Sequence, residues 1–434
     1  MGARTRKNTP TTMTRRIRVM FALVALAATP LFASLGRADR AQTPAGFHRG
    51  IGISHAMAWA RINPGPARAF SFPPFSEPGN ALTLEELRTL RRTGFDFVRL
   101  AVDPGPFLQF QGARRDELDR ILIDRVKLVL DSGLSVIVAF FPSDLHPDYT
   151  ARALTVGLDA PIFQAYLRLL ERTAALLDAL HSSKVALELM NEPPVQPGVW
   201  QPMLKAAYVA ARRRSANLRL VLEGGEEASA AALMAIRTDP FAKDRAVLFT
   251  FHYYDPYQFT HQGASWNDAR YLADVPYPAR MRPLQDSLDA TAAAIAASDL
   301  SQSQKATAYR DAQARLESYR RSGFDDKAIA KSFDQVAAWA RARGLPPDQV
   351  MLGEFGARKT AFQLSGAAAG ERARWFHDVS EAAESRGFGW AVWTYRGAGG
   401  FALTRGETDS DIEPAVAQAL GLGLRPQRRA DGAR

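Results

Sequence analysis

The chain has 434 residues, 47% of them hydrophobic, so it can bury a full core in one large domain or in two of ordinary size. The net charge of +10 lies at the ends: residues 1–42 hold eight Arg or Lys against one Asp, and residues 421–434 hold four Arg against one Asp. The part between them is neutral, which excludes the basic face that nucleic-acid binding requires. The absence of cysteine excludes disulfides, thiolate metal sites and cysteine nucleophiles.

The first 42 residues have the pattern of an export signal. Residues 4–18 are basic, and the apolar run at 19–35 is short and ends in small residues, which is atypical of a membrane span. We expect a secretory signal, cleaved between about Ala33 and Gln42, and a mature protein that is periplasmic or secreted without stable membrane insertion. An uncleaved anchor is the alternative.

Short apolar runs rich in β-forming residues alternate with stretches of helical period through the rest of the chain, which is the pattern of parallel βα units. Eight such strands predict an α/β fold, a (β/α)8 TIM barrel. The helical candidates include 83–94, 119–133, 162–180 and 371–387. The strand candidates are 48–55, 95–102, 134–141, 184–191, 218–224, 246–254, 349–356 and 388–395.

The barrel is expected to form one domain over 43–422, followed by a basic tail at 423–434 that we expect to be disordered. Two segments account for its length beyond the usual barrel. Residues 61–79 are rich in Pro and Gly and predict a long surface loop after strand 1. Residues 283–342 are polar, Ala-rich and helical in pattern, which predicts a helical insertion between strands 6 and 7.

Polar residues stand where several of these apolar runs end. A TIM barrel assembles its active site from the carboxyl ends of its strands, so these residues are the candidates for chemistry. Two carboxylic acids on different strands, surrounded by polar and aromatic groups, are what glycoside cleavage requires, because one must donate a proton while the other stays ionised. The candidates are Arg99, Asn191, Glu192, His252, Tyr254, Glu354 and Trp393.

Four short motifs follow one another at the spacing of barrel strands: NEP at 191–193, H-x-Y at 252–254, GEFG at 353–356 and W-x-Y at 393–395. On these motifs the chain resembles glycoside hydrolase family 5, the cellulase-like retaining glycosidases of the (β/α)8 clan. The resemblance extends from about His48 to Tyr395. It implies catalysis by two glutamates, without a metal or another cofactor.

The resemblance implies a role for each motif. Glu192 is the general acid/base, Glu354 is the nucleophile, and Asn191 donates to the 2-hydroxyl of the sugar at the cleavage point. A glutamate just past an apolar strand also lies beside low-dielectric surroundings, which favour its protonated form. The two prolines that follow Glu192 restrict the turn and keep both side chains oriented.

The remaining matched residues are expected to support this pair. By resemblance, Arg99 and Tyr254 hold Glu354 ionised and oriented. His252 lines the site near the acid/base, and Trp393 forms the floor of the central sugar subsite.

At strand 3 the sequence departs from the family pattern, in which a histidine is usual near the strand end. Here FFPSD at 140–144 follows the apolar run, and the nearest histidine is His146. His146 either enters the site or lies in a surface loop. His55, at the end of strand 1, either binds sugar or caps a loop.

Aromatic residues on predicted βα loops are candidates for stacking on sugar rings, whose faces are apolar. Trp266 is the first of these, with Trp59, Trp200 and Tyr257 beside it, and each is alternatively a packing residue.

Four further glutamates have structural interpretations. Glu188 lies deeper in the barrel and is expected to be a structural ion-pair partner. Glu223, Glu226 and Glu227 follow strand 5 and are expected to be solvated loop charges.

The sequence therefore predicts an exported, monomeric, retaining β-glycosidase, above all an endo-β-1,4-glucanase acting by double displacement on a β-linked oligo- or polysaccharide. The same catalytic frame on another β-glucan or on mannan is an alternative, as is transglycosylation. A non-catalytic glycan-binding protein is the alternative from a different class. The retaining mechanism predicts carboxyl carbons of Glu192 and Glu354 about 5–5.5 Å apart.

Overall fold

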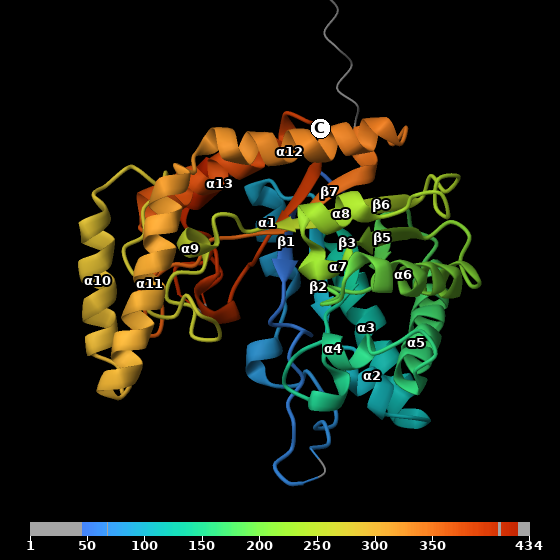
Figure 1. The fold of residues 1–434 in the computed structure, drawn as a ribbon. Helices are drawn as coiled ribbons and strands as arrows, with labels where there is room; N and C mark the ends of the chain where they lie inside the picture. The colour runs from blue at the N-terminus through green and yellow to red at the C-terminus, as the bar shows by residue number, and fades with distance from the viewer. Residues whose placement is uncertain (1–45, 67, 407–408, 424–434) are drawn as a thin grey trace, which may run out of the picture. The chain divides into compact units, whose positions relative to one another are not determined.

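The computed structural model describes residues 46–66, 68–406 and 409–423, so the predicted export segment and residues 424–434 of the predicted tail lie outside the described residues. Eight parallel strands pair in chain order and close into a barrel, which confirms the predicted fold (Figure 1). The strands are β1 (Arg49–Ile53), β2 (Phe97–Val102), β3 (Ser135–Phe140), β4 (Val185–Glu188), β5 (Arg219–Glu223), β6 (Val247–Tyr253), β7 (Val350–Phe355) and β8 (Gly389–Val392).

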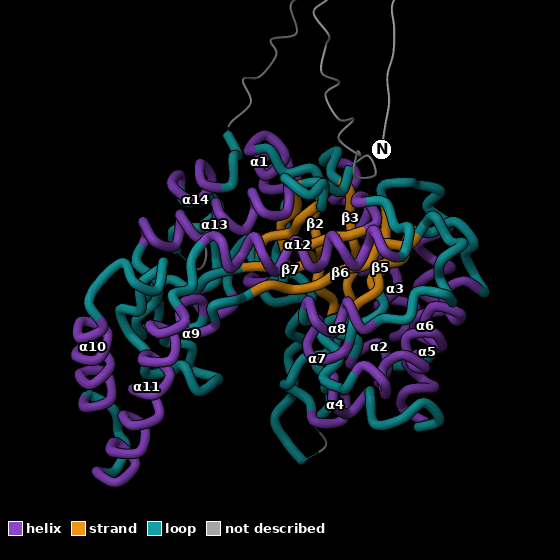
Figure 2. The backbone as a smooth tube through the Cα atoms, turned by 45° about the horizontal axis from the view of Figure 1, so that its top comes forward, coloured by secondary structure: helices purple, strands orange, loops and turns teal. Residues whose placement is uncertain are grey.

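Helices surround the strands, as Figure 2 shows in purple around orange. Their ends follow local sequence signals: α1 begins at a capping box between Thr83 and Glu86 and is followed by Gly94 at φ 120°. None of the helices in the described ranges has both the length and the apolar character needed to cross a membrane. The helices are α1 (Leu84–Thr93), α2 (Gly105–Gln109), α3 (Ala113–Asp131), α4 (Ala151–Leu154), α5 (Pro161–Asp178), α6 (Pro197–Arg212), α7 (Gly225–Ala228), α8 (Ala230–Ala235), α9 (Tyr257–Thr260), α10 (Leu284–Ala296), α11 (Gln302–Ser322), α12 (Asp326–Ala342), α13 (Ala369–Glu384) and α14 (Pro414–Ala419).

The predicted long loop and helical insertion are both present. In its described residues, 54–66 and 68–83, the loop after β1 contains only an isolated bridge between Ile62 and Phe70 and a short 3-10 turn at Pro78–Asn80. The insertion consists of α10 and α11, which lie side by side (Figures 1 and 2). The third helix of the predicted segment, α12, packs against α8 and α13 and serves as the barrel helix between β6 and β7.

An apolar layer fills the end of the barrel interior where the strands begin. Side chains alternate across a strand, so the positions two residues further along face the same interior. On β2, β4 and β5 those positions hold Arg99, Glu188 and Glu223, and the apolar layer is therefore followed by a polar one. The apolar layer consists of Phe47, Phe97, Ile137, Ala186, Val221, Leu248, Met351 and Ala391.

Candidate active site

Arg99 on β2 lies at the centre of the polar layer. Its Nε donates to Glu188 Oε2 on β4 at 2.7 Å, and its Nη1 donates to Glu354 on β7. Its Nη2 donates to Asn191 Oδ1 at 2.7 Å and lies 3.6 Å from Glu223 Oε1 on β5. All five side chains are buried. Arg99 on β2 thus contacts side chains from three other strands or their ends. Glu188 is an ion-pair partner, as predicted from its depth in the barrel.

Glu354 faces the barrel interior because β7 is irregular. The register between β6 and β7 shifts after Phe251, so that His252 pairs with Glu354 rather than with Gly353. A Cβ at Gly353 would lie 2.3 Å from Thr250 Oγ1, so this position has no room for a side chain. The irregularity turns Glu354 inward, where strict alternation would place Gly353.

Both oxygens of Glu354 accept hydrogen bonds. Arg99 donates to Oε1, and the Tyr254 hydroxyl donates to Oε2 at 2.9 Å. Burial, and then the charge of Glu354, raises the pKa of Tyr254 well above its ordinary value, so the phenol keeps its proton and stays a donor. The carboxylate is held in one orientation with a side chain that is almost fully buried.

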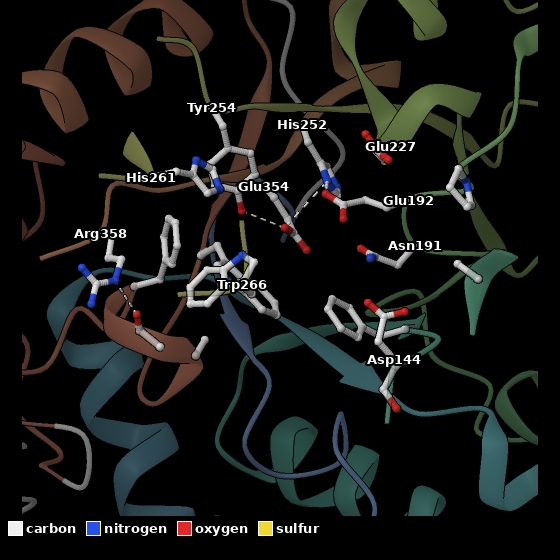
Figure 3. A pocket seen from close by; sticks show the side chains of 18 of the residues that line it. Asp144, Asn191, Glu192, Glu227, His252, Tyr254, His261, Trp266, Glu354 and Arg358 are labelled. Carbon is white, nitrogen blue, oxygen red and sulfur yellow. Dashed lines mark hydrogen bonds and ion pairs between the residues drawn. The ribbon is translucent and has the colours of Figure 1, made fainter. Parts of the chain in front are cut away.

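Glu192 lies at the mouth of the barrel, where its side chain is one-third exposed. Its backbone adopts φ 48°, in the left-handed region, and its N–H donates to Glu223 Oε2 at 2.7 Å. One carboxylate oxygen of Glu192 and one of Glu354 approach within 4.8 Å of each other, and Figure 3 shows the two side chains directed toward one another. Asn191 precedes Glu192, and because Arg99 uses its oxygen, its amide NH2 remains a donor toward the pocket that it lines.

His252 lies between the two glutamates. Its Nδ1 is 2.8 Å from Glu192 Oε1 and 3.7 Å from Glu354 Oε2, and its Nε2 is 3.1 Å from Glu223 Oε1. Burial alone would lower the pKa of His252, but the charges of Glu354 and Glu223 and the contacts with Glu192 and Glu223 raise it well above the ordinary value. Three carboxyl groups thus surround the ring and favour its protonated form.

A pocket of about 1170 Å³ opens over this pair. Trp393, directly after β8, lines it and stacks on Phe141 with ring centroids 5.5 Å apart and an interplanar angle of 7°. Trp266 also lines the pocket and is 57% exposed (Figure 3). Trp59 and Tyr257 contribute to its wall, so three of the four aromatic candidates on loops reach the pocket.

Of the two interpretations of His146, the one that places it in the active site is wrong. Its ring is buried against Phe70 and Tyr149, with centroids 5.2 and 4.7 Å away, and its Nδ1 accepts the N–H of Asp148. The pocket wall after β3 consists instead of residues 142–145. The loop turns the histidine toward the long loop after β1, away from the carboxylates.

Two other candidates also lie outside the pocket wall. Trp200 is not on a loop but on α6, where it is buried and donates through Nε1 to the carbonyl of Glu223 at 2.8 Å. His55 is bound by Arg396, with Nη2 to Nε2 at 3.1 Å, and it packs against Tyr395. These contacts are with residues that follow β8, so His55 does not line the pocket, and its loop-capping interpretation stays a prediction.

The expectation that Glu223 is a solvated loop charge is also wrong. Glu223 is the last residue of β5, and it is buried against Arg99 and His252. Glu226 and Glu227 do lie beyond the strand, in a left-handed turn with φ 48° and 56°, and both line the pocket.

Several residues that line the pocket were not predicted. Phe141 and Asp144 belong to the FFPSD segment, whose position after strand 3 was the available signal. Arg358 is buried two residues beyond GEFG and donates to the carbonyl groups of Ser365 and Gly399, so it shapes the loop after β7. Nothing in the local sequence of Phe401 indicates its place, because it reaches the pocket through a turn after β8.

Glu192, His252 and Glu354 are also the one group in the described part of the chain whose ligand atoms lie close enough to share a metal ion. The surroundings do not suit a metal ion, since Arg99 already supplies positive charge to Glu354, and the carboxyl groups around His252 favour its protonated form, which cannot bind a metal. The arrangement fits two carboxyl groups acting on one bond better than it fits a metal centre.

The chain matches the family described as Cellulase (glycosyl hydrolase family 5) over residues 70–399. It is 24% identical over 349 residues to Endoglucanase 3 of Fibrobacter succinogenes, and 22% identical over 281 residues to Endoglucanase H of Acetivibrio thermocellus. These matches cover 78% and 64% of this chain but 49% and 23% of the relatives. The chain therefore spans about half, or less, of the length of these relatives.

Solved structures share the barrel. Endoglucanase Cel5A of Thermotoga maritima has a TM-score of 0.61 at 18% identity, covering 86% of this chain and 96% of that one. The cellulose synthase subunit Z of Clostridioides difficile has a TM-score of 0.59 at 19% identity, covering 86% of this chain and 99% of that one. At these identities the likeness is one of fold.

The matched range runs through seven of the eight strands, from β2 to β8, and includes both Glu192 and Glu354. It covers well over half of the chain. The chain therefore belongs to glycosyl hydrolase family 5, the cellulase family.

Proposed function

We propose that this chain is a retaining β-glycoside hydrolase, and more specifically an endo-acting β-1,4-glucanase. The observation that carries the proposal is the opposed pair Glu192 and Glu354, with carboxylate oxygens within 4.8 Å of each other. Retaining glycosidases hold their carboxyl groups about 5–5.5 Å apart, whereas inverting enzymes need about 6.5–9.5 Å to admit a water molecule. This approach of single oxygens agrees with the retaining arrangement, in which one carboxylate attacks the sugar, and the separation of the carboxyl carbons stays a prediction.

The surroundings of the two glutamates support different roles in the first half-reaction. Glu354, oriented by Arg99 and Tyr254, attacks the anomeric carbon, and the bond from that carbon to the leaving oxygen breaks. Glu192, at the solvent-facing mouth, gives its proton to the leaving oxygen. A covalent glycosyl ester on Glu354 and an ionised Glu192 result.

In the second half-reaction Glu192 acts as the base. It takes a proton from water, the water oxygen bonds to the anomeric carbon, and the ester bond to Glu354 breaks. Glu354 returns as a carboxylate and Glu192 returns protonated. Two displacements at the same carbon retain its configuration.

The pocket supports a polymeric substrate. Its volume of about 1170 Å³ exceeds the range of roughly 300–1,000 Å³ that is usual for sites of small molecules. Trp393 lines the same pocket as the two glutamates. Trp266 presents a second ring from the loop after β6 (Figure 3). A buried ring in the pocket wall and an exposed ring on a separate loop suit several sugar units of one chain, and the named relatives are endoglucanases.

A β-1,4-glucan is therefore the first substrate to test, with other β-glucans and mannan as alternatives on the same frame. Transglycosylation, in which a sugar hydroxyl replaces water in the second step, uses the same residues. We also propose that the protein is monomeric and acts in the periplasm or outside the cell.

The test is a screen of the purified protein against soluble β-1,4-, β-1,3- and β-1,2-glucans and mannan, with product lengths followed over time. Internal cleavage predicts short oligosaccharides of several lengths from the first minutes, with the β-anomer formed first in NMR spectra. Glu192→Gln and Glu354→Gln should abolish this release. Glu381→Gln, on the exposed face of α13, controls for loss of a carboxylate elsewhere. Products longer than the substrate would favour transglycosylation, and binding without any cleavage would favour a glycan-binding protein and refute the proposal.

A further inference from the structure

Glu223 is a buried carboxylate with no part in either half-reaction, yet it contacts the predicted acid/base by two routes. Its Oε2 accepts the backbone N–H of Glu192 at 2.7 Å. Its Oε1 lies 3.1 Å from His252 Nε2, and the other ring nitrogen of His252 lies 2.8 Å from Glu192 Oε1. Glu223 therefore reaches the backbone of Glu192 directly and its carboxyl group through the imidazole.

The first route, the hydrogen bond from the Glu192 N–H to Glu223, concerns the backbone conformation of Glu192. Glu192 adopts φ 48°, a region that is unfavourable for a residue with a Cβ. Without Glu223, its N–H at the edge of the buried layer would lose its acceptor. Glu223 is itself held, because Trp200 Nε1 donates to its carbonyl at 2.8 Å. The hydrogen bond from Glu192 to Glu223 thus fixes the direction in which the Glu192 side chain leaves the chain.

The second route, from Glu223 through the His252 ring to the Glu192 carboxyl group, concerns the charge of that ring. Glu223 Oε1 and His252 Nε2 are both buried, and within the described residues neither has a well-aligned hydrogen bond to another group. Their contact is an ion pair, with Arg99 Nη2 the other cation near the oxygen at 3.6 Å. An uncompensated charge at this depth is costly, so each of the two ions favours the charged form of the other.

Other charged and titratable groups face this pair from every neighbouring strand. Glu188 is the closest comparison, because it is equally buried and contacts Arg99, but it makes no direct contact with His252 or Glu192. The full set is Arg99 on β2, Tyr166 on α5, Glu188 on β4, Glu192 after β4, Tyr254 after β6 and Glu354 on β7.

We propose that Glu223 is a positioning residue for the acid/base: it holds the backbone of Glu192 and keeps His252 in the imidazolium form that binds the Glu192 carboxyl. The kinetic part of this inference rests on the proposed hydrolase function. The structural part does not, since it concerns the protonation of one ring in the free protein.

The first experiment therefore needs no substrate. The full chain is labelled with ¹⁵N-histidine, and the His252 signals are assigned with a His252→Gln variant. In the unmodified protein both ring nitrogens should stay protonated to a pH well above the ordinary pKa of a histidine ring, whereas in Glu223→Gln the ring should lose a proton at a pH lower by at least about one unit. Glu188→Gln, which removes a neighbouring buried charge, should shift the titration less. A wild-type His252 that titrates near its ordinary pKa would overturn the proposal, even if Glu223→Gln did not fold.

The second experiment uses the pH dependence of kcat/KM on an activated aryl glycoside. Glu223→Gln keeps an acceptor for the Glu192 N–H but lets His252 lose its proton at lower pH. The alkaline limb, on which the imidazolium beside Glu192 is lost, should therefore move to lower pH by about one unit. Glu223→Ala removes both routes and should lower kcat further. Because Glu223 acts in part through His252, the effects of Glu223→Gln and His252→Gln should be less than additive.

A purely structural role predicts a different result: kcat that falls equally at every pH, and effects of the two substitutions that add. Either finding would reject the charge route. If the wild-type protein cleaved no glycoside while His252 remained protonated, the proposed function would fail and the placement of His252 by Glu223 would stand.

Discussion

Arg99→Met should destabilise the protein strongly and in a pH-dependent way. Arg99 is fully buried and faces three buried carboxylates, Glu188, Glu223 and Glu354. Removing one partner of a buried ion pair costs about 3–5 kcal/mol, because the charge left behind is uncompensated. We expect a loss of that size in the free energy of unfolding at pH 8, measured by urea denaturation.

The pH dependence follows from Glu188. Burial raises its pKa to about 7, and Arg99 opposes that rise, so the substitution should raise this pKa further. A carboxyl whose pKa is higher in the folded state holds its proton there more firmly than in the unfolded chain, so its contribution to stability is lost as pH rises. The variant should therefore recover part of its stability at pH 5. A loss below about 1 kcal/mol, or one that is equal at pH 5 and pH 8, would refute this account of the polar layer.

Arg372→Met is the matched control. Arg372 is also buried, but its carboxylate partner Glu413, at 3.0 Å, is partly exposed. Water can solvate that carboxylate once the arginine is gone, so the loss should depend much less on pH.

Three further outcomes can be checked. Glu354→Ala should be inactive and should recover activity with added azide, giving a product of inverted configuration. Glu192→Ala with azide should give a product of retained configuration on activated substrates. If the two stereochemical outcomes were reversed, the roles of the two glutamates would have to be exchanged. Trp393→Ala should lower kcat/KM on oligosaccharides by about tenfold while the fold persists, as checked by circular dichroism, and unchanged kinetics would remove Trp393 from the subsite. Burial raises the pKa of Asp103 to about 6. The contribution of the protonated Asp103 carboxyl to stability should therefore fade as pH rises toward 6. The free energy of unfolding of Asp103→Asn, relative to wild type, should improve by about 1.4 kcal/mol per pH unit between about 4 and about 6.

The barrel could be predicted from sequence because each strand carries its own signal. The runs that end at 102, 140 and 253, for example, are mainly apolar and are followed by turn residues, and all eight observed strands lie inside the predicted ranges. Parallel strands buried on both faces read as continuous apolar runs, and the barrel then brings their carboxyl ends together without any information from the loops.

Side-chain direction could not be predicted in the same way. Whether Glu354 points inward depends on a shift of one residue at Gly353, and nothing in GEFG distinguishes a regular strand end from an irregular one. Glu223 stands before GGEE and has the local sequence of a loop glutamate, although its partners come from β2 and β6. The position of the His146 side chain could not be predicted for a related reason, because the turn after β3 decides which side of the loop the ring occupies.

His252 lies where one positive charge can stabilise the negative charge in both half-reactions of the proposed cycle. In the first half-reaction Glu354 loses its negative charge as the ester forms, and Glu192 gains one as its proton leaves. In the second half-reaction the charge returns. His252 Nδ1 lies 2.8 Å from Glu192 Oε1 and 3.7 Å from Glu354 Oε2, so one cation faces the charge at both of its positions. A fixed cation between the two carboxylates needs no reorganisation as the charge moves, which is the condition under which buried electrostatic groups assist a reaction most.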